Sequence, residues 1–456
     1  MVVRLAVEAG ATTAVELAEP SWSPWRRMMF RYAFVVLGVG MAGVWVLHML
    51  LRSVGVSQQA VMGVAKWTAL HPLTDQVGEH VFGVHVDWSL TGSGDTAANW
   101  ASMFTLLVVA VPIAVMWSVL DRRRPHYARL YAWFRLVLRL ALMSALLLYG
   151  VTKLLPSQMA FALDRLVEPF GDLSPMAVLW SQTASSEPYE IALGAAEVTA
   201  GVLLILPFTA GLGAVLAVVV TLQVFLLNLT FDVPVKILSG QLLVYATVLA
   251  APEIVRVVRA LTGHAVPMRG PEALVPSPRG RRILVAAQVM MGMWVLFTTL
   301  TEGHDAWRTY GNGRPHSALY GIWDVTEYTV AGQEVPALVD FRPTPPQGQL
   351  IGPADRFRRL IFDVPQGVTA QRMDDSLVSF PVEIDADLHT VTITKDLSHQ
   401  WKLAVLNYDQ PQADQLVLDG QLAGRPVRLR LTRVDLDRFR GISRGFHWVQ
   451  PVPYLR

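Results

Sequence analysis

Ionisable side chains interrupt the apolar segments in the middle of this sequence. Glu197 lies inside an apolar run, and Asp232 and Lys236 stand four residues apart before another, so they can share one helix face. A charged group surrounded by lipid costs free energy, so such residues are functional candidates by default. Together with Tyr149 and Lys153, these groups could carry protons between a bound molecule and water. Lys153 is the expected ion-pair partner of Glu197.

Four further residues complete the candidate site, as ligand-binding positions. Gln223 and Asn228 approach the depth of Glu197 from the next helix, and Asp172 lies in a neighbouring loop. Trp323 belongs to the C-terminal part of the chain and is treated below. The histidines have no spacing typical of a metal centre, so no metal site is expected.

A purely structural interpretation of the same residues stays open. Asp232 suits a helix N-cap, with Pro234 tolerated in the first turn and Lys236 forming an interfacial ion pair. Glu197 could equally be a packing residue that is hydrogen-bonded between helices. The glycines and alanines around it favour close helix packing.

Composition assigns the chain to a membrane class. Hydrophobic residues make up 52% of the 456 residues and charged residues 16%, which is too apolar for an ordinary soluble protein. The net charge of +2 is too small to indicate a nucleic-acid partner. The absence of cysteine excludes disulfides, thiol redox chemistry and thiolate metal ligands. The expected partner is the lipid bilayer.

Seven apolar runs are predicted to be membrane-spanning helices that position the candidate site. A shorter run, Met176–Trp180, cannot span a bilayer and is expected to be re-entrant or to lie on the surface. The seven predicted spans are Tyr32–Leu51, Trp100–Leu120, Leu136–Leu155, Tyr189–Leu206, Leu212–Leu227, Ile237–Ala251 and Ile283–Thr301.

The arginines predict the orientation of these spans. Six lie between Arg122 and Arg139 and six between Arg256 and Arg282. Arginine-rich loops stay in the cytoplasm, which places the N-terminus inside and everything after Thr301 outside. The first span is expected to be a retained anchor and not part of a cleaved signal, because no small-residue cleavage site closes it. We expect a multi-pass protein of a bacterial inner membrane with a periplasmic C-terminal domain.

Beyond Ala318 the pattern changes to the alternation of half-buried strands. Eight consecutive antiparallel strands fit a soluble, closed up-and-down barrel, which we expect to be packed or narrow. Asp385–Asp387 and Leu422–Gly424 are predicted hairpin turns. The predicted strands are Leu319–Val330, Arg356–Asp363, Val368–Met373, Leu377–Ile384, Thr390–Lys395, Trp401–Tyr408, Gln415–Leu422 and Arg425–Val434.

The predicted organisation therefore has five parts. Residues 1–31 form a cytoplasmic tail, residues 32–148 the first spans with an outer loop, and residues 149–262 a helical core. Residues 263–301 form a basic inner loop with the last span, and residues 302–456 the barrel domain.

The first strand carries Gly321-Ile-Trp323, which resembles the Gly-x-Trp signature of lipocalin-like barrels. That resemblance implies that Trp323 closes the barrel floor and that a late arginine, Arg430 or Arg433, packs over it.

The membrane part resembles the DoxX family of bacterial membrane proteins, in its longer form with extra helices and an outer β domain. The motifs that carry the resemblance are Tyr149–Lys153, Glu168–Pro175, Glu197, Asn228–Lys236, Thr91–Thr96, Asp121–Pro125 and Arg444–Trp448. The resemblance implies a four-helix core and a link to quinone-dependent redox chemistry, with a quinone or similar isoprenoid among spans three to six. The chain supplies no redox centre of its own, so electron transfer would need a partner subunit or a bound organic cofactor.

Three functions remain open at this stage, and whether the protein is an enzyme is one of the open questions. The first is a membrane subunit of a quinone-linked redox system. The second is a non-catalytic binder or carrier of an apolar molecule. The third is a structural protein of the cell envelope, in which the polar cluster only locks helices together.

Overall fold

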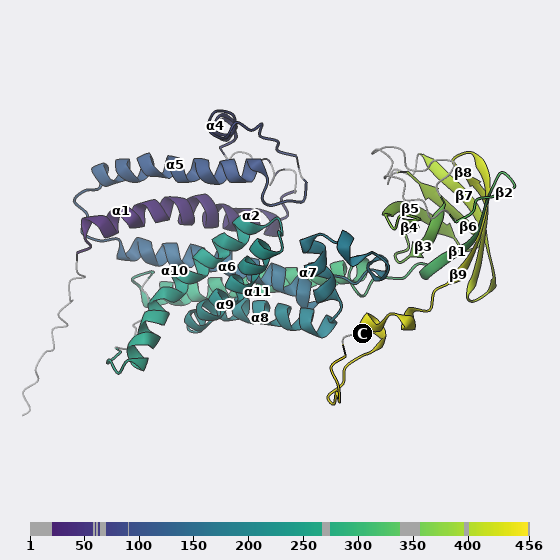
Figure 1. The fold of residues 1–456 in the computed structure, drawn as a ribbon. Helices are drawn as coiled ribbons and strands as arrows, with labels where there is room; N and C mark the ends of the chain where they lie inside the picture. The colour runs from purple at the N-terminus through teal and green to yellow at the C-terminus, as the bar shows by residue number, and fades with distance from the viewer. Residues whose placement is uncertain are drawn as a thin grey trace, which may run out of the picture. The chain divides into compact units, whose positions relative to one another are not determined.

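The computed structural model describes residues 21–57, 60, 63, 70–89, 91–266, 274–337, 356–395 and 401–454 (Figure 1). The predicted N-terminal tail lies outside the described residues as far as residue 20. The described chain divides into two compact units. The first comprises the described residues up to Leu142 together with Val244–Gln288, and the second comprises Met143–Leu243 together with the described residues from Val289 onwards.

Seven helices among the described residues are long and apolar enough to cross a membrane, which confirms the seven predicted spans and a multi-pass membrane protein. The first is continuous from Pro24 to Arg52 and is built from α1 (Pro24–Ala33), the π-helix η1 (Phe34–Gly43) and α2 (Val44–Ser53). The others are α5 (Ala97–Leu120), α6 (Ala128–Leu154), α8 (Glu187–Ile205), α9 (Ala210–Thr230), α10 (Lys236–Leu261) and α11 (Pro278–Thr309).

The helices extend beyond the predicted spans because polar residues at their ends find partners. The first helix begins at Pro24, where the Ser23 hydroxyl accepts a hydrogen bond from the Arg26 amide. Arg31 is buried inside this helix and donates to the Tyr127 hydroxyl at 2.9 and 2.7 Å. The predicted start at Tyr32 was therefore too late, because Arg31 lies inside the helix instead of marking its end.

Shorter helices connect these spans. The run predicted to be too short to span belongs to α7 (Pro175–Ala184), which is capped by Ser174 and has only ten residues. Among the described residues, the remaining short helices between spans are α4 (His71–Val77), η2 (Gly78–Phe82), η3 (Leu163–Leu166) and η4 (Phe170–Asp172), and two more, η5 (Leu436–Arg438) and α12 (Arg440–Ser443), follow the last strand.

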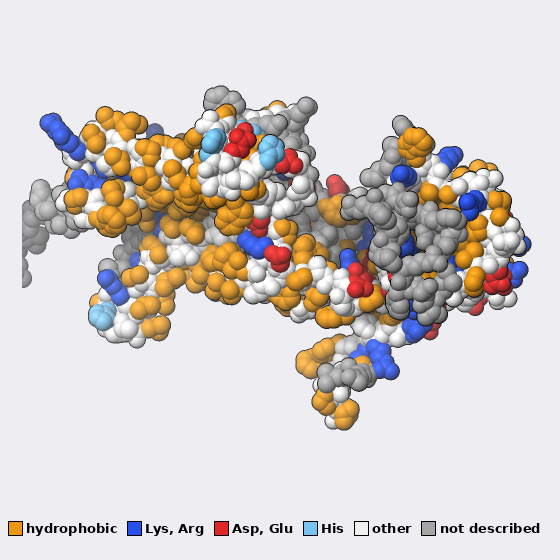
Figure 2. Space-filling model, turned by 45° about the horizontal axis from the view of Figure 1, so that its top comes forward, with side chains coloured by type: hydrophobic (Ala, Val, Ile, Leu, Met, Phe, Trp, Pro, Cys, Tyr) orange, Lys and Arg blue, Asp and Glu red, His pale blue; other side chains and the backbone are white. Residues whose placement is uncertain are grey.

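Large apolar side chains cover most of the visible helical surface in Figure 2. On α5 the exposed side chains include Val108, Val111, Val115 and Val119. An apolar surface this extensive is costly in water and matches the lipid-facing side of membrane helices. The outward faces of the spans are therefore suited to acyl chains.

The C-terminal part of the second unit is a closed antiparallel barrel, as predicted. Its eight strands follow one another around the barrel, and β1 pairs with β9 to close it. A two-residue strand, β2 (Gln333–Glu334), adds to β1 and was not predicted. The barrel strands are β1 (Gly321–Val330), β3 (Phe357–Phe362), β4 (Gly367–Arg372), β5 (Leu377–Asp385), β6 (Thr390–Thr394), β7 (Lys402–Gln412), β8 (Gln415–Leu422) and β9 (Arg425–Arg433).

Alternating side chains fill the barrel interior. Trp323, Leu360, Phe362 and Leu429 belong to one continuous cluster of buried apolar side chains drawn from all eight strands. This is the packed interior that the alternation predicts. Only β7 departs clearly from its predicted bounds, since it extends to Gln412 and pairs there with Gln415.

Both predicted hairpin turns are confirmed. Ala423 and Gly424 join β8 to β9 with φ values of 48° and 76°, as a two-residue turn with both central residues left-handed requires. In the β5–β6 turn, a carboxylate oxygen of Asp385 accepts hydrogen bonds from the amides of Asp387 and Leu388.

Candidate functional site

Two glycines bring helices α6 and α8 into close contact. A Cβ atom at Gly194 would lie 2.2 Å from the backbone nitrogen of Leu154, and one at Gly150 would lie 2.8 Å from the Cβ atom of Glu197. No other residue type fits these positions without separating the helices. The expected role of small residues in helix packing is therefore confirmed, and this contact positions the polar groups of the site.

Lys153 and Glu197 form a buried ion pair across this contact. The Lys153 Nζ atom lies 3.0 Å from Oε1 and 3.1 Å from Oε2 of Glu197. The two residues are only 7% and 3% exposed. Lys153 also donates to the backbone oxygen of Tyr149 at 3.3 Å, which gives the ammonium group three acceptors. The partner predicted for Glu197 is confirmed.

A cavity of about 170 Å³ adjoins this ion pair within the second unit. This is roughly ten times the ~10–15 Å³ that one water molecule needs. Side chains of α6, α7, α8, α9 and α10 line it, and most of them are apolar. The predicted residues Tyr149, Lys153, Glu197, Gln223 and Asn228 all contribute to its wall.

Asn228 is the cavity residue with an unused hydrogen-bond donor. Its side chain is 6% exposed, and its Nδ2 atom is buried without a hydrogen-bond partner among the described residues. An unpaired buried donor costs about 1–3 kcal/mol, so a molecule that brings an acceptor to Asn228 would recover that free energy.

Asp232 and Lys236 form an ion pair but lie outside the cavity wall. Their charged atoms are 2.8 Å apart, and the Asp232 side chain is 80% exposed. Asp232 has a φ of 52°, which turns the chain between α9 and α10, and α10 begins only at Lys236. The prediction that Asp232 caps this helix was wrong, because an N-cap residue needs extended backbone and must directly precede the first turn.

The remaining two predicted site residues lie elsewhere in the second unit. Asp172 is exposed in η4 and is not among the residues that line the cavity. Trp323 is buried in the barrel interior, where its Nε1 donates to the backbone oxygen of Leu319 at 2.9 Å. Its indole nitrogen is thus already satisfied, and it contributes packing to the barrel.

The arginine that packs over Trp323 is Arg433. Its guanidinium carbon lies 6.0 Å from the centre of the indole ring, and it donates to the backbone oxygen of Tyr320 at 2.9 Å. Arg430 instead pairs with Glu327, and both side chains are more than half exposed. Of the two arginines left open by the sequence, the structure selects Arg433.

Glu190 is a buried carboxylate that the predicted site did not include. It precedes Glu197 by two helical turns and is fully buried. Its Oε1 accepts a hydrogen bond from the Met159 amide at 3.2 Å, and its Oε2 has no partner among the described residues. The seven-residue spacing, which puts both carboxylates on one helix face, was the signal available in the sequence.

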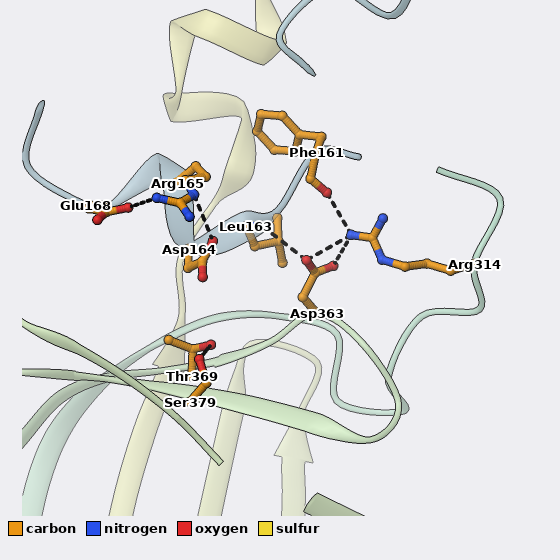
Figure 3. A network of polar contacts seen from close by, with 9 residues as sticks. All are labelled: Phe161, Leu163, Asp164, Arg165, Glu168, Arg314, Asp363, Thr369 and Ser379. Atoms are coloured by element: carbon orange, nitrogen blue, oxygen red, sulfur yellow. Dashed lines mark hydrogen bonds and ion pairs between the residues drawn. The ribbon is translucent and has the colours of Figure 1, made fainter. Parts of the chain in front are cut away.

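The loop after α6 links the cavity wall to the barrel (Figure 3). Met159 lines the cavity, and Leu163 further along the loop donates its amide to Asp363 at 3.3 Å. Arg314 holds the same carboxylate at 2.9 and 3.0 Å and donates to the backbone oxygen of Phe161 at 2.7 Å. The cavity wall and the barrel surface are thus joined by one short, hydrogen-bonded segment.

Asp164 lies in this loop beside the Arg165 side chain, which also contacts Glu168. Burial raises the pKa of the Asp164 carboxyl above its ordinary value, and the nearby Arg165 charge opposes this shift only in part. The contact between loop and barrel therefore contains one carboxyl group that resists ionisation.

The described residues include no group of three histidine or acidic side chains that could hold a metal ion.

Comparison with known proteins yields one relative. The uncharacterised protein YwoB of Bacillus subtilis (strain 168) is 32% identical over 120 residues, which cover 24% of this chain and 71% of that protein. No family model matches the chain. No solved structure matches it either.

Proposed function

The chain belongs to the family of the uncharacterised Bacillus subtilis protein YwoB, and from that premise we propose that its cavity binds a quinone-type lipid. The protein would act as a membrane subunit of a quinone-linked redox system. Family membership assigns no activity here, so the proposal rests on the cavity and on the resemblance to DoxX proteins. The observation that carries it is a buried Lys153–Glu197 pair in the wall of an otherwise largely apolar cavity.

The shape of the site supports a ligand with an apolar body and a polar head. Lipid-binding cavities combine apolar walls with a few polar groups that fix the orientation of the ligand. Here the apolar walls come from five helices, and Asn228 offers a free donor. A quinone ring carries carbonyl oxygens that accept such a hydrogen bond, and its isoprenoid tail suits the walls.

The ion pair supplies groups that can exchange protons with such a ring. Reduction of a quinone to a quinol consumes two electrons and two protons. Lys153 and Glu197 would exchange protons with the ring oxygens, and the Tyr149 side chain lines the same cavity. The chain has no cysteine, so the electrons would come from a partner subunit or a bound organic cofactor.

The arginine pattern supports a specific orientation of the protein. The loops around Arg122–Arg139 and Arg256–Arg282 would face the cytoplasm of a bacterial cell, with the inner membrane as the location. The barrel would then be periplasmic, and the cavity would open near the outer face of the membrane.

A second candidate function is non-catalytic binding or transport of an apolar molecule. The Lys153 ammonium already has three acceptors within 3.3 Å, so the pair can hold α6 against α8 without any proton transfer. The same cavity would then bind its ligand through its apolar walls alone.

The test is to identify what the purified protein binds. The wild type, Glu197→Gln and a matched control, Glu383→Gln on the exposed side of β5, would be purified in mild detergent. Organic extracts would be compared by mass spectrometry, and size-exclusion chromatography would show that each variant is folded. We expect a stoichiometric quinone in the wild type and the control that is lost from Glu197→Gln.

Other outcomes separate the alternatives. An apolar molecule retained equally by all three proteins would favour the non-catalytic binder. Bulk phospholipid in every sample would contradict both ligand-binding proposals and leave a structural role for the ion pair.

A further inference from the structure

The chain that follows the barrel is basic and rich in aromatic residues. From Arg438 to Arg456 it contains four arginines and no acidic residue. Its aromatic members are Phe439, Phe446, Trp448 and Tyr454. Neither the cavity nor the barrel interior accounts for this composition. We call residues 440–454 the C-terminal segment.

The large apolar side chains of this segment are exposed. Phe446 is 76% exposed, Trp448 91% and Val449 80%. The Phe446 and Trp448 rings contact each other edge to face, with their centres 5.0 Å apart. An exposed apolar cluster of this kind is unfavourable in water and marks a surface that binds a membrane or another protein.

The chain leaves the barrel at the end of β9, next to the start of β1, where it enters the barrel. Trp323 near the start of β1 pairs with Arg433 at the end of β9, and the Val434 amide donates to the Ile322 oxygen at 2.8 Å. Leu436 and Phe439 then pack onto a cluster with Leu163. Entry and exit of the barrel therefore share one end, and the loop after α6 packs there.

That end of the barrel is tethered near membrane helices by short connections. Leu163 follows Leu154, the last residue of α6, by nine residues, and Gly321 follows Thr309, the last residue of α11, by twelve. Twelve extended residues reach at most about 40 Å. The C-terminal segment therefore begins within reach of a bilayer surface.

We propose that the C-terminal segment lies in the interface of the bilayer. Tryptophan and tyrosine concentrate at this depth because one end of the ring is apolar and the other forms hydrogen bonds. The Phe446 and Trp448 rings would enter the boundary between headgroups and acyl chains. Arg440 and Arg444 would bind the phosphates of anionic lipids. This anchoring is independent of what the cavity binds.

The composition favours a lipid surface over a protein partner. Residues 440–454 contain two arginines and no acidic residue, which complements an anionic surface, whereas protein interfaces usually combine charges of both signs. The two arginines, Arg440 and Arg444, are followed within the segment by Phe446, Trp448 and Tyr454, so one short stretch offers both cations and rings to an interface with an anionic and an apolar layer. In Figure 1 the segment is drawn at the yellow end of the chain.

The absence of cysteine makes a direct test possible. A single nitroxide label would be placed at Val449→Cys in the full-length protein, which preserves both rings. The control is Arg425→Cys, an exposed position at the start of β9 and thus at the opposite end of the barrel. Both proteins would be reconstituted in nanodiscs of phosphatidylcholine with phosphatidylglycerol, and the label's accessibility to oxygen and to a water-soluble nickel complex would be measured.

The proposal predicts that the Val449→Cys label is accessible to oxygen but protected from nickel, while the control is accessible to both. Adding Phe446→Ser and Trp448→Ser should restore access to nickel, and Arg440→Gln with Arg444→Gln should weaken the protection. Nickel access at Val449→Cys equal to that of the control would overturn the proposal. So would protection from both reagents, which indicates a protein contact.

Discussion

Glu190 and Glu197 lie on one face of α8, two turns apart, yet only Glu197 meets a cation at hydrogen-bonding distance. Both oxygens of Glu197 lie within 3.1 Å of Lys153, whereas Glu190 has a single backbone amide as its partner. One helix face thus presents an ion-paired carboxylate beside the cavity and a buried carboxylate behind it. Glu197 lines the cavity, whereas Glu190 holds the loop at Met159 by accepting a hydrogen bond from its amide.

The effects of substituting Lys153 and Glu197 on the free energy of unfolding should be strongly coupled. Lys153→Met or Glu197→Leu alone strands a buried charge and should lower the free energy of unfolding by about 3–5 kcal/mol. The double variant should recover most of this loss, because it removes both charges. Thermal unfolding in detergent, analysed as a double-mutant cycle, measures the coupling. Strictly additive effects would show that the pair contributes no specific interaction.

The contact between α6 and α8 should tolerate no side chain at Gly194. Gly194→Ala places a Cβ atom 2.2 Å from the Leu154 nitrogen, so the helices must separate and stability should fall by about 1–3 kcal/mol. Gly171→Ala is the matched control, because an added Cβ there meets nothing within 4 Å. Unfolding temperatures measured in detergent decide the matter, and equal effects of the two substitutions would contradict the close-packing argument.

Asn228→Leu separates ligand binding from folding. If a ligand accepts a hydrogen bond from Asn228 Nδ2, the loss of that bond should weaken binding up to about tenfold, which corresponds to roughly 1.4 kcal/mol. The empty protein should be as stable as the wild type or more so, because a buried unpaired donor is removed. Titration with decylubiquinone, followed by the rise in unfolding temperature, measures both effects. Unchanged affinity would exclude Asn228 from the ligand contact.

The contact between loop and barrel should depend on pH through Asp164. Its pKa is raised by burial, so the folded protein binds the proton more tightly than the unfolded chain does. The stabilisation that comes from the protonated Asp164 carboxyl is fully present below its ordinary pKa of 3.8. It is lost as the pH rises through the raised pKa that Asp164 has in the folded protein. Asp164→Asn should flatten this part of the pH profile and stabilise the protein at neutral pH.

Asp87→Asn provides the comparison for this profile. Hydrogen bonds from the Ser89 backbone and hydroxyl lower the pKa of Asp87, so its contribution is lost as the pH falls. The two substitutions should therefore change the slope of stability against pH in opposite directions. Calorimetry across the acidic range would reveal this, and slopes of the same sign would refute the assignment for Asp164.

Arg433 should matter to the barrel more than Arg430. Arg433→Met removes the guanidinium from the Trp323 ring and from the Tyr320 oxygen, and should cost about 1–2 kcal/mol. Arg430→Met breaks only an exposed pair with Glu327 and should cost about 0–1 kcal/mol. Chemical unfolding followed by the loss of the β-sheet band in the infrared spectrum compares the two variants. Equal losses would mean that the packing over Trp323 contributes nothing.

The barrel was predictable because each strand carries its own signal. Alternation along β8 fixed both of its ends, and the Ala423–Gly424 turn fixed where β9 begins. The ends of the helices were predicted less accurately, because an arginine such as Arg31 is normally taken to lie outside a membrane span. In the structure its guanidinium group donates hydrogen bonds to the hydroxyls of Tyr127 and Ser118, two partners distant in the chain.

The candidate site was predictable as a set of polar residues but not as a geometry. Lys153 and Glu197 could be paired because each would be costly alone in an apolar helix. Asp172 and Asp232 were predicted from their position at the outer ends of spans or in outer loops, yet neither lines the cavity. A residue lines the cavity only if helix packing buries it there. The contacts between helices that determine this burial cannot be predicted from local sequence patterns.

The pairing of β1 with β9 has a consequence for the synthesis of the protein. The strand that closes the barrel is the last to leave the ribosome, and its partner is the first. Until then β1 and β8 are open edges that can pair with any extended chain. A chain released before residue 425 would carry both edges and be prone to aggregation or proteolysis. Pairing of β9 with both β1 and β8 therefore removes the two open edges in a single step.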